Sequence, residues 1–193
     1  LDWIYEKKVF SPDLMGNIPL ELRKKLHEEF LWDLPEIQTS SESEDGATKL
    51  LLKTKGERFS YETVILRYNN RVSLCVSSQV GCKKACRFCQ TGRLGFFKNL
   101  SAGEIVAQFA LASKIVGAEG RRISHVVFMG MGEPLDNFEN VMQACSILTK
   151  EEKKGFGLSQ RKVTVSTVGV VPRIEELAGR LKGSLALSLH ACN

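Results

Sequence analysis

Three closely spaced cysteines are the part of this chain best suited to chemistry. Cys82, Cys86 and Cys89 stand in the run GCKKACRFCQ, a C-x3-C-x2-C spacing on one short segment. Three such thiolates can wrap a single metal centre, but a structural zinc ion and an ordinary iron–sulfur cluster usually take four protein ligands. Three ligands with no obvious fourth suggest a cluster with one open iron, where a substrate or second cofactor can bind.

Spacing alone leaves two other interpretations of the cysteines open. A structural zinc site would need a distant fourth ligand, such as His125, His190 or Cys145. Unliganded thiols are the second alternative. A disulfide framework does not fit, because 6 cysteines in 193 residues are far fewer than small disulfide-rich secreted proteins carry.

The composition is that of a globular protein whose charge is unevenly spread. Hydrophobic residues make up 43% and charged residues 25%, and no apolar run approaches membrane-spanning length. Residues 1–62 hold 9 Lys+Arg against 13 Asp+Glu, whereas residues 63–193 hold 18 against 9. A basic second part fits a polyanionic partner such as RNA or DNA, and it equally fits an ordinary solvated surface.

A helix, a polar linker and three strands are expected before the cysteine run. Residues 19–32 are expected to form an amphipathic helix, with Leu20, Leu22, Leu26, Phe30 and Leu31 near helical spacing. Residues 40–46 are polar and end in glycine, so they are expected to form a loop or linker. Residues 50–53, 63–67 and 72–76 are expected to be strands. We therefore expect a helical part with its linker (1–45), a β-hairpin extension (46–71) and an α/β part (72–193).

Strands and helices alternate in the α/β part. A capping-box signature at Ser101 and Glu104 predicts the start of a helix with Ile105, Phe109 and Ala112 on its inner face. The further strands are expected at residues 125–129, 163–167 and 185–189, and the further helices at 138–148, with Val141, Cys145 and Leu148 inward, and at 172–181. This alternation predicts a parallel sheet, whose strands end at one rim. The cysteine loop, residues 130–134 and 166–169, and His190 should therefore share that rim.

A glycine turn that ends in an acid follows the second of these strands. The run MGMGEP (129–134) combines glycines, which allow close backbone approach, with the carboxylate of Glu133. A zwitterionic cofactor such as S-adenosylmethionine could fill an open iron with its amine and carboxylate. Backbone carbonyls and a nearby acid would then hold its ammonium group.

Together these motifs resemble the radical S-adenosylmethionine (SAM) superfamily, and within it the adenine-C2 branch of the RlmN/Cfr family of RNA methyltransferases. The resemblance covers nearly the whole chain. It rests on LCVSSQVGC (74–82), FMGMGEP (128–134), VTVSTVG (163–169) and ALSLHA (186–191), and on WIY (3–5), NIP (17–19) and LR (22–23) near the start.

The resemblance implies a fold and a set of site residues. The fold would be part of a (βα)6 barrel, with about the first four strand units present, behind a small helical accessory domain. Cys82, Cys86 and Cys89 would ligate a [4Fe–4S] cluster. The matching SAM contacts are Gly132, Glu133, Ser166, Ser188, Leu189 and His190. Cys75 matches a cysteine that forms a transient disulfide with a methyl-carrying cysteine, and Glu62 matches a proposed proton acceptor.

The resemblance also implies an activity and its partners. The family methylates carbon 2 of adenosine in ribosomal RNA and some tRNAs through a methyl-cysteine intermediate and a radical derived from SAM. A monomeric cytoplasmic enzyme with an electron donor such as flavodoxin or ferredoxin would follow, with Lys83, Lys84, Arg87, Arg93 and Lys98 as candidate RNA contacts. The alternatives are a Cfr-like carbon-8 methyltransferase and a non-catalytic zinc-binding RNA module.

The chain departs from the family pattern at its C-terminal end. A barrel of six units needs about two more strand–helix units after Asn193, and the methyl-carrying cysteine belongs to that region. We therefore expect this sequence to be a fragment of a longer protein. On its own it is expected to have little or no methyltransferase activity.

Overall fold

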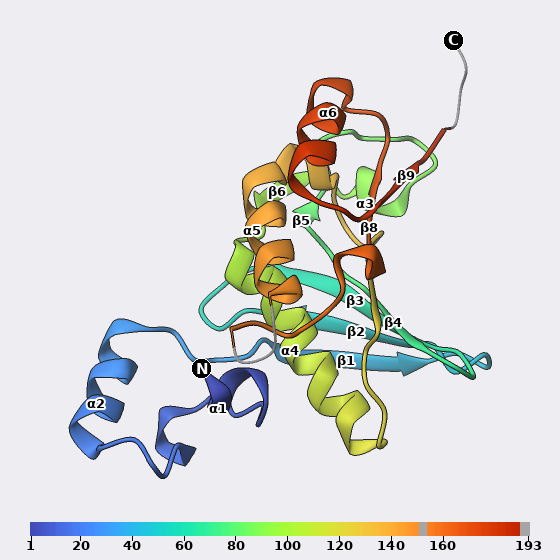
Figure 1. Ribbon diagram of the computed structural model, residues 1–193. Helices are drawn as coiled ribbons and strands as arrows, with labels where there is room; N and C mark the ends of the chain where they lie inside the picture. Colours follow the sequence, from blue (N-terminus) through green and yellow to red (C-terminus); the bar gives the residue numbers. More distant parts are fainter. Residues whose placement is uncertain (151–153, 190–193) are drawn as a thin grey trace.

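The computed structural model describes residues 1–150 and 154–189, in which one seven-stranded sheet carries the fold (Figure 1). The strand order is β1-β2-β3-β4-β7-β8-β9, and β5 and β6 form a separate two-stranded sheet. The strands are β1 (Glu36–Glu42), β2 (Thr48–Lys53), β3 (Ser60–Arg67), β4 (Val72–Cys75), β5 (Gln79–Gly81), β6 (Phe96–Asn99), β7 (His125–Phe128), β8 (Val163–Thr167) and β9 (Ser184–Leu187). The helices are α1 (Asp2–Tyr5), α2 (Leu20–Glu29), α3 (Gln90–Arg93), α4 (Ala102–Ala118), α5 (Phe138–Thr149) and α6 (Val171–Arg180), with 3-10 turns η1 (Pro12–Leu14), η2 (Pro134–Asn137) and η3 (Gln160–Lys162).

The sheet has an antiparallel half and a parallel half. Strands β1 to β4 form an antiparallel meander, whereas β4, β7, β8 and β9 pair in parallel. Parallel neighbours require long crossovers, and here α4, α5 and α6 provide them. The predicted α/β class with a parallel sheet is therefore confirmed, with about four barrel strands in the chain.

One face of the sheet is packed against α4 and α5 to form the core. Leu74, Val126 and Val165 point to that face and are 0% exposed. The predicted inward residues of α4 and α5 are buried: Ile105, Phe109, Ala112, Val141, Cys145 and Leu148. Because successive side chains of a strand point to opposite faces, the neighbouring residues of these strands lie on the uncovered face.

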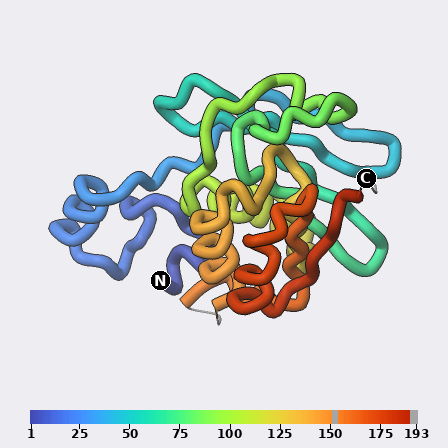
Figure 2. The backbone as a smooth tube through the Cα atoms, turned by 90° about the horizontal axis from the view of Figure 1, so that it is seen from above, coloured from blue at the N-terminus to red at the C-terminus, as the bar shows by residue number. Residues whose placement is uncertain are grey.

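The predicted N-terminal helix is present, but its apolar side chains are not buried. Helix α2 is shorter than the predicted span 19–32 and buries none of its residues. Leu20 is 57% exposed, Phe30 57% and Leu31 97%. Figure 2 shows this segment projecting to one side of the α/β part. Apolar periodicity predicted the helix correctly, but periodicity carries no information about which element will cover the apolar stripe.

Residues 40–42 form the end of a strand, so the loop predicted at 40–46 is wrong in its first half. Strand β1 pairs with β2 from Glu36 opposite Lys53 to Glu42 opposite Thr48, and every one of its side chains is exposed. A strand pairs through backbone groups, so this polar edge strand shows no alternation in its sequence.

Among the described residues, none of the helices has the length and apolar character needed to span a membrane.

The capping box predicted at the start of α4 is confirmed, and it also ties the meander to that helix. The Ser101 hydroxyl accepts the Glu104 N–H, and the Glu104 carboxylate accepts the Ser101 N–H. The same carboxylate accepts hydrogen bonds from Thr54 on the meander at 3.1 Å and from Lys98 on β6 at 3.0 Å. Burial alone would raise the pKa of Glu104, but these donors lower it on balance.

Replacing Ser101 with alanine should lower the free energy of unfolding by about 1 kcal/mol, because one helix N–H loses its side-chain acceptor. Urea unfolding followed by circular dichroism measures the loss. Ser159→Ala is the matched control, since Ser159 is also an N-cap residue but its side chain makes no capping hydrogen bond. Equal losses in the two variants would contradict the assigned role of the cap.

Candidate functional site

The cysteine loop joins the two strands of the small sheet. Strand β5 leads into it and β6 follows it, in the upper half of Figure 1. The Cys82 N–H donates to the Gly95 carbonyl at 2.9 Å, and the Cys89 N–H donates to the Cys86 carbonyl at 3.0 Å. The first bond closes the base of the loop, the second forms a turn within it, and the three side chains are left partly exposed. The hairpin therefore presents the thiols instead of burying them as core residues.

The sulfur of Cys82 lies in a shared electrostatic environment with the other two thiols. Burial raises the pKa of Cys82 most, and the nearby charges of Glu133, Cys86 and Cys89 raise it further, against a backbone hydrogen bond near Lys84. Within the described residues, no three Cys, His, Asp or Glu side chains converge on one metal-ion position. The five cysteines in that part of the chain are all free thiols. Such mutually interacting thiolates are stabilised when a positively charged centre binds among them.

The glycine turn after β7 is pressed against the segment that joins β4 to β5. A Cβ atom on Gly132, whose φ is +101°, would lie 2.5 Å from the Cβ of Gln79. A Cβ atom on Gly130 would lie 2.7 Å from the Ser77 hydroxyl. Only glycine allows the two segments to approach this closely, which explains the glycines of this motif without reference to a ligand.

The carboxylate of Glu133 is buried, at 3% exposed, and binds backbone amides in this structure. One of its oxygens accepts the Leu135 N–H and the other accepts the Val168 N–H, each at 3.0 Å. Val168 follows β8, so this acid joins the ends of β7 and β8 at the predicted rim. Each carboxylate oxygen has a second lone pair, so a cationic group can still be accepted there.

Sequence analysis missed a set of buried polar side chains behind these loops. Ser77 and Ser78 lie between the end of β4 and the start of β5 at Gln79, and all three residues are at most 1% exposed. Asn137 donates to the carbonyls of Ser78 and Leu100 at 2.7 Å, so it fastens the same segment from η2. An uncharged polar triplet directly after a buried strand was the available signal, because buried polar groups require dedicated partners.

Four of the predicted site residues lie on the uncovered face of the sheet. The register places Cys75 opposite Val64 of β3 and Val127 of β7. Glu62 lies two residues before Val64 on β3, so it is on the same face as Cys75. The same alternation puts Ser166 and Ser188 on this face, and their hydroxyl oxygens are 3.2 Å apart. Leu189 is 64% exposed beside them. The remaining predicted contact, His190, lies outside the described residues.

Cys75 and Glu62 differ in how accessible their chemistry is. Burial raises the pKa of the Cys75 thiol to about 11, although a backbone hydrogen bond near Met129 opposes this shift. The carboxylate of Glu62 is 3.2 Å from the Lys49 ammonium, and both side chains are roughly half exposed. At neutral pH Cys75 is therefore a protonated thiol, and Glu62 is a solvent-accessible ion-paired acid on the same face.

Two of the five lysines and arginines suggested as RNA contacts are used inside the protein. Lys84 pairs with Asp136 of η2 at 3.1 Å, which links the cysteine loop to the glycine turn. Lys98 pairs with Glu57 and Glu104. Lys83 lies over the ring of Phe96, and Arg93 donates to the Arg87 carbonyl. Lys84 and Lys98 therefore serve to hold the loop in place.

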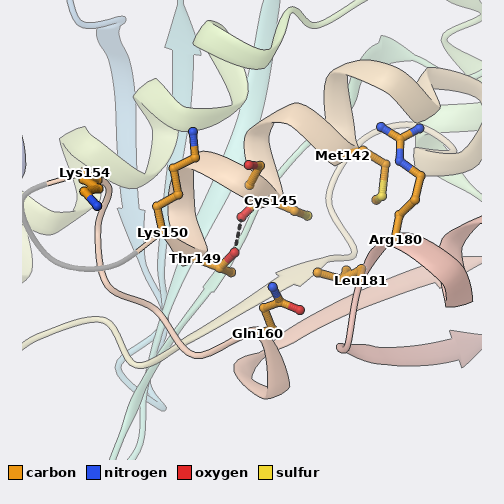
Figure 3. Close-up of a pocket in the computed structure, with 9 residues that line it drawn as sticks. Met142, Cys145, Thr149, Lys150, Lys154, Gln160, Arg180 and Leu181 are labelled. Atoms are coloured by element: carbon orange, nitrogen blue, oxygen red, sulfur yellow. Dashed lines mark hydrogen bonds between the residues drawn. The ribbon is translucent and has the colours of Figure 1, made fainter.

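A cavity of about 630 Å³ lies away from all of these residues (Figure 3). It opens between the C-terminal ends of α5 and α6, at the end of the sheet where the parallel strands begin. It is lined by Met142, Cys145, Ser146, Thr149, Lys150, Lys154, Gln160, Arg180 and Leu181. Sites in parallel sheets form where strands end, so this cavity is not the candidate site.

Alkylation of Cys75 by iodoacetamide should depend on pH with a pKa of about 11. Only the thiolate reacts, so at pH 8 Cys75 in the folded chain should react roughly a hundredfold or more slowly than an exposed cysteine of ordinary pKa. Its rate should rise about tenfold for each pH unit below its pKa. Peptide mass mapping isolates this residue. The same chain in urea is the control, and identical profiles in the two states would refute the effect of burial.

Replacing Glu133 with glutamine should destabilise the fold by about 1–3 kcal/mol. An amide offers one acceptor oxygen, so either the Leu135 or the Val168 N–H would lose its partner. Urea unfolding measures the loss. Glu139→Gln is the control, because its carboxylate is 68% exposed and pairs with Arg180 on the surface. A Glu133→Gln variant as stable as this control would contradict the bridging role.

Comparison with known proteins places this geometry in a family. The family model of the radical SAM superfamily matches residues 76–193. A solved radical SAM methyltransferase from Sphaerobacter thermophilus superimposes with a TM-score of 0.92 at 38% identity, over 100% of this chain and 56% of that one. The family-model match begins at residue 76, directly after β4, and includes both the cysteine loop and the glycine turn.

Curated relatives are similar along the entire chain. A probable dual-specificity RNA methyltransferase RlmN of Dictyoglomus thermophilum is 42% identical over 193 residues, 100% of this chain and 54% of that protein. The dual-specificity RNA methyltransferase RlmN of Francisella tularensis subsp. novicida is 46% identical, over 99% of this chain and 52% of that protein. The chain thus spans about half the length of the curated relatives it matches. The superfamily's cofactors are a [4Fe–4S] cluster and S-adenosylmethionine, as the sequence predicted, and the chain belongs to the radical SAM superfamily.

Proposed function

We propose that this chain is the cluster- and SAM-binding part of an RNA methyltransferase that modifies carbon 2 of adenosine. One observation carries the proposal: a three-cysteine loop and a glycine–glutamate turn are hydrogen-bonded to one segment, beside a sheet face that carries Cys75. The RlmN relatives are named dual-specificity RNA methyltransferases, which supports an RNA substrate and methyl transfer.

The cluster and SAM are assigned to separate residues. Cys82, Cys86 and Cys89 would ligate three irons and leave the fourth to SAM. The backbone at Gly132 and the carboxylate of Glu133 would hold the ammonium group. Ser166, Ser188, Leu189 and His190 would line the remainder of the cofactor's site. When bound, the reduced cluster and SAM together supply a carbon radical and the methyl group.

Cys75 and Glu62 are assigned to the RNA-modifying steps. Cys75 would attack a methyl-carrying cysteine and form a transient disulfide that frees the modified base. Its raised pKa keeps the thiol protonated until a base removes the proton. Glu62 lies two residues along β3 from Val64, the residue opposite Cys75, and would accept a proton from the base. Its carboxylate lies 3.2 Å from the Lys49 ammonium, and both side chains are roughly half exposed on that face.

The partners and context follow from the same proposal. Ribosomal RNA and tRNA would bind along the basic part of the chain, with Lys83, Arg87 and Arg93 as the candidate contacts that are exposed. A low-potential donor such as flavodoxin or ferredoxin would supply the electron, and the protein would act as a monomer in the cytoplasm. Residues 1–45, 46–71 and 72–193 would serve as helical accessory part, β-extension and barrel, respectively.

Anaerobic reconstitution with iron and sulfide should give a brown chain with visible cluster absorbance, and SAM should change its electron paramagnetic resonance (EPR) spectrum. Cys82→Ser, Cys86→Ser and Cys89→Ser should each abolish the cluster, whereas Cys145→Ser, which alters a core thiol, should leave it intact. A colourless zinc protein would overturn the proposal.

A second experiment tests the RNA substrate and the modified position, using protein expressed from the whole gene that encodes this sequence. Ribosomal RNA and tRNA are incubated with it, SAM and reduced flavodoxin, and the nucleosides are resolved by mass spectrometry. We expect 2-methyladenosine. Formation of 8-methyladenosine instead would replace the proposed reaction with the carbon-8 alternative, and the absence of any methylated adenosine would refute both.

A further inference from the structure

We propose that Gln79 is a positioning residue that sets the glycine–glutamate turn against the cysteine hairpin, so that SAM can contact both at once. This inference rests on the proposed function and deepens it. Gln79 is the first residue of β5, three positions before Cys82, and its side chain is 0% exposed.

The side-chain amide of Gln79 joins the two motifs directly. Its oxygen accepts the Glu133 N–H at 2.9 Å, and its nitrogen donates to the Asn99 side-chain oxygen at 2.8 Å. Asn99 ends β6, the strand that leads away from the cysteine loop. One amide thus holds the glycine turn on one side and the base of the hairpin on the other.

The backbone of the same residue reinforces this contact. The N–H groups of Ser78 and Gln79 both donate to the Met131 carbonyl, at 2.9 and 3.1 Å. The Gln79 Cβ would be 2.5 Å from a Cβ at Gly132, so the turn is seated on this side chain. Residues 131 to 133 are therefore located relative to the hairpin by hydrogen bonds and by contact.

This relative placement matters because one small molecule has to reach both motifs. In the proposed function, the amine of SAM binds the open iron while it also contacts the turn at Glu133. An error of about 1 Å between such groups can cost about a hundredfold in rate or binding. A buried amide with both of its polar ends bonded is a rigid way to prevent that error.

A second buried glutamine provides a matched comparison. Gln108 on α4 is also 0% exposed and also makes two hydrogen bonds, at 2.9 Å each. Both of its bonds go to the backbone of Ser77, and neither reaches the turn or the hairpin. Gln79 and Gln108 therefore share residue type, burial and number of bonds, and they differ in what they hold.

The test compares Gln79→Met with Gln108→Met in the full chain, each with its cluster reconstituted. Methionine keeps the length of the side chain and removes its hydrogen bonds. SAM affinity is measured by titrating the cofactor-induced change in the EPR spectrum of the reduced cluster. We expect at least tenfold weaker SAM binding for Gln79→Met and less than twofold for Gln108→Met, with equal cluster content in both.

A readout without any cofactor accompanies this titration. Amide hydrogen exchange of Glu133 should accelerate at least tenfold in Gln79→Met relative to Gln108→Met, because only that variant removes the acceptor of this N–H. Gln79→Glu is the second variant if Gln79→Met folds poorly. It keeps an acceptor oxygen for the Glu133 N–H, so its exchange should stay closer to that of the unchanged chain.

The outcomes separate this inference from the proposed function. Equal losses of SAM affinity in the two methionine variants would reduce Gln79 to a packing role and overturn the inference alone. Unchanged affinity in Gln79→Met would do the same. An unchanged chain that carries a cluster but gives no spectral response to SAM would overturn the proposed function, and the inference with it.

Discussion

Three consecutive polar residues, Ser77, Ser78 and Gln79, are buried in the segment between β4 and the cysteine loop, and the rest of the site is built on them. Buried polar groups without partners cost about 1–3 kcal/mol each, so every one of these groups must find a partner. The glycine turn supplies several of them, since the Met131 N–H donates to the Ser77 hydroxyl and the Met131 carbonyl accepts two amides. The turn is thereby drawn onto this segment, and only glycines fit at so short a distance.

Other contacts at the rim extend this arrangement to neighbouring strands. Glu133 reaches from the glycine turn to the backbone after β8, and Lys84 reaches from the cysteine loop to Asp136 of η2. Charged groups that hold backbone and one another in this way lose mobility, which favours a site formed before its ligands bind. The sheet face that bears Cys75 and the paired hydroxyls of Ser166 and Ser188 lies beside this rim, opposite the face packed against α4 and α5.

The fold of the α/β part was predictable because its signals are local and periodic. Strand β8 was predicted at its observed bounds, and the inward residues of α4 and α5 follow from helical spacing. The capping box at Ser101 is likewise a four-residue signal. The N-terminal part was predicted less well. The residues of α2 carry an apolar stripe that nothing in the described chain buries, and β1 carries no stripe although it is a strand.

Residue types and their order in the chain were enough to predict the donor set: three thiols after one strand, a glycine–glutamate turn after the next, and hydroxyls at the ends of two more. Parallel strands end at one rim, so this order requires that the groups meet. How they are held there depends on contacts that form only in the folded chain. The hydrogen bonds of Gln79 join it to Glu133 and Asn99, which are far from it in the chain. The burial that raises the pKa of Cys75 also arises only in the folded structure. Contacts of that kind have no spacing in the sequence, since they depend on which side chains the fold brings within about 3 Å of one another.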